Sequence, residues 1–163
     1  MKKRDIALTV VCLFAFMYTS VWVQQYLRSR DELLRGEALT STIAKKYLAY
    51  AKLLPLREKN MLTAEQDQAF EETQYDYYQA VTQAITAFDN CLHCYTPFNE
   101  YLPRAAKAMM DIGDDCLNKN EFHLSLRAYR LLRVSPDPEW VMKADKMIEE
   151  AYAKIDRLRA RTG

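Results

Sequence analysis

The feature that most constrains this chain is an apolar run from Ile6 to Val23, which contains no charged residue, no glycine and no proline. An α-helix rises about 1.5 Å per residue, so a helix over this run is roughly 27 Å long. The hydrocarbon core of a bilayer is about 30 Å thick, and short flanks supply the difference. The run therefore predicts a transmembrane helix over residues 6–23, within an N-terminal segment of residues 1–27.

A secretory signal peptide also begins with basic residues and an apolar core, but the sequence favours an uncleaved anchor. Cleavable signals have a core of about 7–15 residues followed by small residues of the A-x-A type. Here the core is longer and its exit is bulky, with Tyr18, Trp22 and Tyr26 following one another at helical spacing. Such rings are typical of membrane–water interfaces, so they predict an interfacial belt at the end of the span.

The orientation of the anchor follows from the basic residues at its two ends, because cytoplasmic flanks carry the excess of lysine and arginine. The front carries Lys2, Lys3, Arg4 and the α-amino group, and the back carries Arg28, Arg30 and Arg35. This narrow excess predicts a single-pass protein of the inner (plasma) membrane whose C-terminal domain is extracytoplasmic, in the periplasm. A C-terminal domain left in the cytoplasm is the open alternative.

The composition of the remaining chain predicts an all-α domain. The sequence holds only 3 Gly and 5 Pro, which are the costly residues in helix interiors, and it is rich in the residues that favour helices. No alternating pattern typical of a strand is found. The formal net charge is +1, so no basic face is indicated and no nucleic-acid partner is predicted.

Two helices that form a hairpin are predicted over residues 28–54 and 63–92. Pro55 disfavours helical geometry at Leu54 and is expected to end the first helix, while Thr63 with Gln66 three residues later has the spacing of a capping box. Each helix repeats apolar residues every three or four positions: Leu27, Leu34, Ala38 or Leu39, Ile43, Tyr47, Tyr50 and Leu54 in the first, and Phe70, Tyr77, Val81, Ala84 or Ile85, Phe88 and Leu92 in the second.

Further helices are predicted as a hairpin within residues 100–134 and a last helix over 138–160, which completes a domain of residues 28–160. Asn99 can cap the first of these helices. Asp137 followed by Pro138 is a strong start signal, because proline at the first helical position lacks only an N–H that would be unpaired anyway.

Part of this region has the residue pattern of a known repeat. The matching residues are Ile112-Gly113 at a Leu-Gly pair, Cys116 at a tyrosine position, Asn120-Glu121-Phe122 at a turn, Ser125-Leu126 at an Ala-Leu pair and Tyr129 at an aromatic position. By these matches, the segment of residues 106–139 resembles one tetratricopeptide repeat, a helix–turn–helix of about 34 residues. The resemblance implies stacked antiparallel hairpins, with the helix from Pro138 as the solvating cap.

The order of anchor, hairpin, aromatic connection and second hairpin also resembles small single-pass bacterial membrane proteins of unassigned function. That resemblance implies a location and an architecture but no chemistry. The predicted fold is thus all-α: an N-terminal transmembrane helix, stacked antiparallel tetratricopeptide-like hairpins and a C-terminal capping helix.

Cys91 and Cys94 enclose His93, but their spacing does not indicate a redox or haem site. A c-type haem needs histidine directly after the second cysteine, where Tyr95 stands. The pair is predicted at the C-terminal end of a helix, where the dipole raises the pKa of a thiol rather than lowering it.

The cysteines leave three readings open. Cys91, Cys94, Cys116 and His123 could bind zinc, with His93 as a substitute ligand, because thiolate and imidazole groups suit tetrahedral zinc. A disulfide could join Cys91 or Cys94 to Cys116, or all three could be buried free thiols. The zinc ligands are candidates only, and the sequence predicts no bound metal and no cofactor.

Aromatic residues gather in two clusters that a helix break joins. Aromatic side chains are favoured anchors of protein interfaces, so the partner-binding candidates are Tyr75, Tyr78, Tyr95, Phe98 and Tyr101. The alternative reading of these residues is core packing.

The sequence predicts no enzyme, because it contains no nucleophile elbow, no phosphate-binding glycine loop and no H-E-x-x-H motif. The predicted function is a membrane-anchored helical scaffold or adaptor that binds a protein partner. The alternatives are a structural accessory subunit of a larger membrane complex and a redox or metal protein that uses Cys91 and Cys94.

Overall fold

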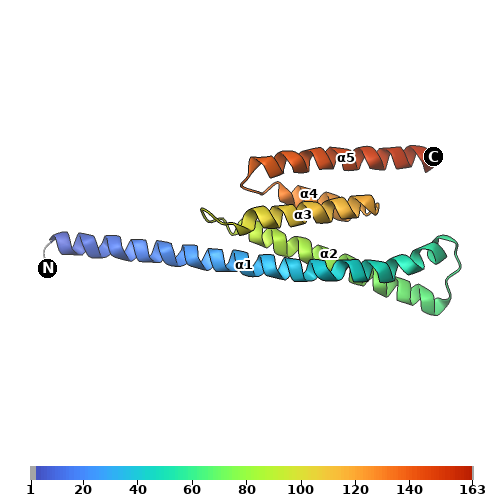
Figure 1. Cartoon of the computed structure of the whole chain (residues 1–163), viewed down its shortest axis with the longest axis horizontal. Coiled ribbons are helices and arrows are strands. Elements are labelled where there is room, and N and C mark those ends of the chain that lie inside the picture. The colour runs from blue at the N-terminus through green and yellow to red at the C-terminus, as the bar shows by residue number, and fades with distance from the viewer. Residues whose placement is uncertain (1–2, 163) are drawn as a thin grey trace.

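The structure, a computed structural model, describes residues 3–162 and the side chains of residues 8–161. Its five α-helices are α1 (Lys3–Glu58), α2 (Ala64–His93), α3 (Tyr101–Asn118), α4 (Phe122–Leu132) and α5 (Pro138–Thr162), with no strand over the described range. The all-α prediction is confirmed. Each helix packs against the next in sequence, α1 also contacts α3, and the N-terminal part of α1 extends alone beyond the other four helices (Figure 1).

The apolar run forms the projecting part of α1. From Leu8 to Val23 every side chain except that of Trp22 is exposed, and α1 is long and apolar enough to cross a membrane, with none of its most apolar window buried. Lys2 and the side chains of Lys3 and Arg4 lie outside the described residues, so the orientation inferred from them stays a prediction.

Beyond the run, α1 pairs with α2 along a seam of positions that alternate by four and three residues. The seam positions are Ser29, Leu33, Gly36, Thr40, Ile43, Tyr47, Tyr50 and Leu54, all buried or partly buried. The predicted stripe is correct from Ile43 onward and at Leu39, which packs against the core. It is wrong at Leu27 and Leu34, which are 44% and 52% exposed.

The seam begins with small residues because α2 places bulky ones opposite them. A Cβ atom on Gly36 would lie 2.5 Å from Cε1 of Phe88, and Phe88 is fully buried. Ser29 faces Cys91, with 3.2 Å between Oγ and Sγ. Large apolar residues at Ser29 and Gly36 would overlap α2, so Leu27 and Leu34 lie outside the seam, while Leu33 is buried in it.

The prediction that Pro55 ends the first helix is wrong, since α1 continues through it to Glu58. Proline removes one hydrogen bond and its ring crowds the carbonyl one turn before it, which can bend a helix without ending it. Here the final turn is closed independently. Asn60 adopts a left-handed φ of 53°, and the Met61 N–H donates to the Leu56 carbonyl at 2.9 Å, as in a Schellman cap. The last turns of α1 bend away from its axis (Figure 1).

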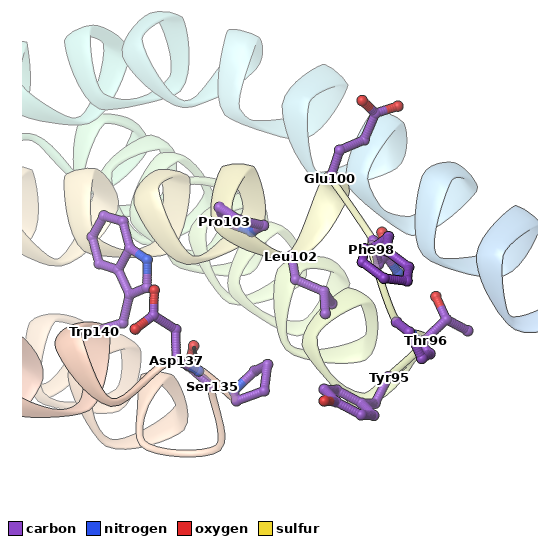
Figure 2. Close-up of a pocket in the computed structure, with 12 residues that line it drawn as sticks. Tyr95, Thr96, Phe98, Glu100, Leu102, Pro103, Ser135, Asp137 and Trp140 are labelled. Carbon is purple, nitrogen blue, oxygen red and sulfur yellow. Dashed lines mark hydrogen bonds between the residues drawn. The ribbon is translucent and has the colours of Figure 1, made fainter.

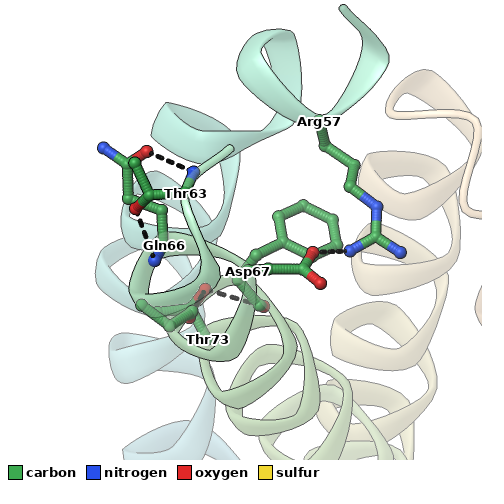
Figure 3. Close-up of polar contacts among 7 residues, drawn as sticks. Arg57, Thr63, Gln66, Asp67 and Thr73 are labelled. Atoms are coloured by element: carbon green, nitrogen blue, oxygen red, sulfur yellow. Dashed lines mark hydrogen bonds and ion pairs between the residues drawn. The ribbon is translucent and has the colours of Figure 1, made fainter. Parts of the chain in front are cut away.

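The predicted capping box of α2 is confirmed. The Gln66 N–H donates to Thr63 Oγ1 at 3.3 Å, and the Thr63 N–H donates to Gln66 Oε1 at 3.0 Å (Figure 3). An ion pair between Arg57 and Asp67 joins the end of α1 to the first turn of α2. These contacts fix the turn at the end of the hairpin furthest from the apolar run.

The second hairpin closes around Gly113. A Cβ atom there would lie 2.4 Å from Cε1 of Tyr129 on α4, whose hydroxyl donates to Asp114 Oδ1 at 2.6 Å. Helix α4 ends two residues before the predicted boundary, at Leu132. Asp137 caps α5 as predicted, because its Oδ1 accepts from the Glu139 N–H at 2.9 Å.

Candidate functional site

The connection of residues 94–100 between α2 and α3 is fastened to α1 by one buried side chain. The Asn99 amide donates to Ser29 Oγ at 3.0 Å and to the Cys94 carbonyl at 3.2 Å. The Tyr101 N–H donates to Asn99 Oδ1 at 3.0 Å, which satisfies the first N–H of α3. Asn99 therefore acts partly as the predicted cap and also links three helices.

Tyr26 makes a second link between this connection and α1. Its ring lies 5.0 Å from that of Tyr101, centroid to centroid. The two hydroxyl oxygens lie 3.2 Å apart, and the Tyr26 hydroxyl also donates to Glu100 Oε1 at 3.2 Å. The hydrogen bond with Tyr101 is the main reason that the pKa of Tyr26 rises to about 12. The phenol is therefore a neutral donor at physiological pH.

Phe98 stands at the tip of the connection in an unusual conformation. Its φ is 61° and its side chain is 99% exposed. A bulky residue with positive φ costs about 1–3 kcal/mol and persists only where its surroundings impose it. The buried contacts of Asn99 supply that restraint, and neighbouring Tyr95 is also exposed.

A shallow cavity of about 330 Å³ lies between this connection and the start of α5. Figure 2 shows Tyr95 and Phe98 on one side of it and Trp140 with Asp137 on the other. The hydroxyl of Thr96, a buried lining residue, has no hydrogen-bond partner among the described residues. The site thus combines exposed aromatic rings with an unsatisfied polar group.

A second groove, of about 320 Å³, lies where α1, α2 and α3 meet. Small apolar side chains dominate its walls, and they come from Ile43, Ala44, Val81, Ala108, Ile112 and Cys116. The exposed Asp111 and Asp115 stand at its edge, one helical turn apart. Lys119 pairs with Asp115 and lies 3.9 Å from the centroid of the Tyr47 ring. Within residues 8–161 Asp111 forms no ion pair, so the edge keeps an acidic character.

The structure does not bring the cysteines and histidines together. Cys91 lies beside Ser29, whereas Cys116 lies beside Tyr77, roughly 20 Å back along α2. A disulfide needs Cα atoms within about 7 Å, so Cys91 and Cys116 cannot pair. Within residues 8–161 no three His, Cys, Asp or Glu side chains form a metal-binding group, and the cysteines are free.

The thiols are also unreactive by environment. Burial raises the pKa of Cys91 and of Cys94, and it raises the pKa of Cys116 to about 12. His123 packs its ring edge-on against Tyr78, with centroids 5.0 Å apart. Neither nucleophilic chemistry nor metal binding is favoured by these surroundings.

The aromatic candidates fall in two separate regions. Tyr78 is partly buried and donates to Glu121 Oε2 at 2.7 Å, while Tyr75 is 65% exposed nearby on α2. Tyr95, Phe98 and Tyr101 lie beyond the other end of α2, roughly 25 Å away along the helix. They do not share one groove with the first region, and their role in partner binding stays a prediction.

The sequence did not indicate the groove beside Asp111, because its walls come from three helices. The link from Asn99 to Ser29 joins residues 70 positions apart, and no local pattern reveals it.

No protein family, no curated protein and no solved structure matches this chain.

Proposed function

We propose that this chain is a membrane-anchored helical adaptor, which holds a binding groove for a protein partner at a fixed height above the bilayer. The observation that carries the proposal is the continuity of α1. One helix of 56 residues contains both the exposed apolar run and one half of the first hairpin. A flexible tether would position the groove loosely, whereas a continuous helix positions it rigidly.

The proposed location is the inner membrane, with residues from about 28 onward in the periplasm. It is supported by the basic residues before the apolar run, as cytoplasmic flanks carry the excess of positive charge. A cytoplasmic domain would leave the adaptor role unchanged and would reverse only the side on which the partner is found.

The order of helix contacts supports tetratricopeptide-like stacking as part of this proposal. Helices α1 and α3 are the first helices of consecutive hairpins, and they contact each other as well as their own partners. In stacked helical hairpins the repeated elements form an extended concave surface. The groove beside Ile43 and Ile112 lies between these two helices and is the binding surface we propose.

The partner we propose for this groove is a helical or extended protein segment that inserts an apolar side chain and carries a basic residue beside it. The apolar walls of the groove suit the inserted apolar side chain, and the carboxylate of Asp111 at the edge suits the basic residue. No catalytic step is part of the proposed function.

Site-specific photocrosslinking in native membranes tests the proposal. A photoreactive amino acid at Ala108 in the groove should capture one partner, and the same probe at Glu149, exposed on α5, should not. Asp111→Lys should abolish the crosslink, while Glu149→Lys, which makes the same charge change elsewhere, should retain it. Equal capture at both positions, or capture that survives Asp111→Lys, would contradict the groove as the binding surface.

A second candidate is an accessory subunit of a membrane complex, and one observation favours it. Leu27, Leu34 and Leu48 recur every seven or fourteen residues on the outer face of α1, and all three are at least 44% exposed. Such a stripe could pack on a neighbouring subunit. A stable high-molecular-weight species in mild detergent that dissociates on Leu34→Lys would favour this function over the adaptor.

A further inference from the structure

The connectivity of the helices places certain loops next to the membrane. Because α1 leaves the apolar run and α2 returns toward it, the connection of residues 94–100 lies at the end of the domain that faces the run. Figure 1 shows this connection reaching further toward the N-terminal end than the α4–α5 connection does. It is the part of the domain nearest to the projecting helix.

The contacts with α1 give the height of the connection. Tyr26 and Ser29, which bind Tyr101 and Asn99, follow Val23 by three and six residues. At about 1.5 Å per residue they stand roughly 4.5 and 9 Å beyond the end of the apolar run. The polar layer of a bilayer is about 5–8 Å thick on each side. The Tyr26–Tyr101 contact therefore lies at the depth of the lipid headgroups and the Ser29–Asn99 contact at their outer edge, which holds the connection against the headgroup layer.

The residues at its tip suit that depth. Phe98 is fully exposed and Tyr95 is 65% exposed, and aromatic rings favour the boundary between headgroups and acyl chains. The left-handed backbone at Phe98, imposed by buried Asn99, keeps the ring out of the core. On α1 the rings of Tyr18 and Trp22 pack 5.2 Å apart, and Tyr26 packs on Tyr101, so aromatic groups continue from the span to the connection.

We propose that Tyr95 and Phe98 form a second membrane contact, in which both rings enter the interface of the leaflet from which α1 emerges. Lipid is the occupant because the tip continues the aromatic surface of the anchor at headgroup depth. Arg28, an exposed residue of α1 five positions after Val23, carries a positive charge that suits lipid phosphate. The inference rests on the anchor of the proposed function, and it adds a contact that fixes the direction in which α1 tilts.

Fluorescence quenching of the full chain tests this contact. The protein is reconstituted in vesicles of phosphatidylcholine and phosphatidylglycerol whose acyl chains are brominated near the headgroup. In a Trp22→Phe, Trp140→Phe background, the indole of Phe98→Trp should be quenched and its emission shifted to the blue. Tyr75→Trp in the same background is the matched control, because Tyr75 is also exposed but lies on α2 away from the anchor. It should be neither quenched nor shifted.

A third tryptophan variant of the chain shows whether the anchor or only the second membrane contact has failed. Trp140→Phe alone retains Trp22, which should be quenched if α1 crosses the bilayer. Quenching of Trp22 without quenching of Phe98→Trp would overturn the second contact and leave the anchor standing. An unquenched Trp22 would overturn both. Equal quenching of Phe98→Trp and Tyr75→Trp would also overturn the contact, since it would show no preference for the tip.

Discussion

Gly36 should resist even a methyl group, although alanine is the better helix former. Alanine gains about 0.5–1 kcal/mol over glycine in a helix interior. The added carbon, however, would lie 2.5 Å from Cε1 and 2.7 Å from Cζ of Phe88. That ring is fully buried between α1 and α2, so it cannot swing aside. Overpacking typically costs about 1–3 kcal/mol, and we therefore expect Gly36→Ala to lower the free energy of unfolding by about 1 kcal/mol.

Urea unfolding of the full chain in detergent micelles measures this change. The far-ultraviolet circular dichroism reports the helices and the near-ultraviolet signal reports the tyrosines. Ala38→Gly on the exposed side of α1 reports helix propensity alone and should lose up to about 1 kcal/mol. Phe88→Leu combined with Gly36→Ala should recover about 1 kcal/mol relative to the sum of the single changes, since residues in contact are coupled. A stabilising Gly36→Ala, or additive effects in the double variant, would refute the close packing of Gly36 on Phe88.

Three further predictions follow from local contacts. Thr63→Ala should destabilise the protein by about 1 kcal/mol through loss of the capping box, and Thr63→Ser should not, as thermal unfolding will report. Asn99→Ala should cost about 1–3 kcal/mol because it removes the hydrogen bonds to Ser29 Oγ, to the Cys94 carbonyl and to the Tyr101 N–H, and proteolysis should then cut the 94–100 connection faster. Burial raises the pKa of the Cys116 thiol from 9.0 to about 12, so its contribution to stability is complete below pH 9 and is lost as the pH rises to 12. Chemical denaturation across this range should show a fall of up to about 1.4 kcal/mol per pH unit, which Cys116→Ala should reduce.

The parts of the fold that the sequence predicts correctly are those with local signals. Thr63 with Gln66, and Asp137 with Pro138, define helix starts through residues within one turn, and both starts are where they were expected. The apolar positions of α2 are also correct, because large residues such as Phe70 and Phe88 occupy its buried face. Such elements need no knowledge of what they pack against.

The buried face of α1 before Ile43 could not be predicted in this way. The orientation of this face is set by Phe88 and Cys91 on α2, which leave room only for small residues at positions 36 and 29. A search for large apolar residues at helical spacing selects Leu27 and Leu34, although the buried leucine is Leu33. The candidate site could not be predicted for the same reason: its contacts join residues that are far apart in the sequence. Asn99 has the sequence signal of a cap, but its bond to Ser29 depends on the register of α1 against α2–α3.

The unbroken passage of α1 from the apolar run into the domain makes the helix a lever arm. Residues 24–50 extend about 40 Å along the axis, and transmembrane helices tilt by about 20° on average. A tilt of that size displaces the region around Tyr50 sideways by about 14 Å. In the membrane-anchored adaptor that we propose, a change in bilayer thickness that alters the tilt would therefore move the α1–α3 groove parallel to the membrane surface, because α1 is continuous between Val23 and Leu33 and no hinge absorbs the motion.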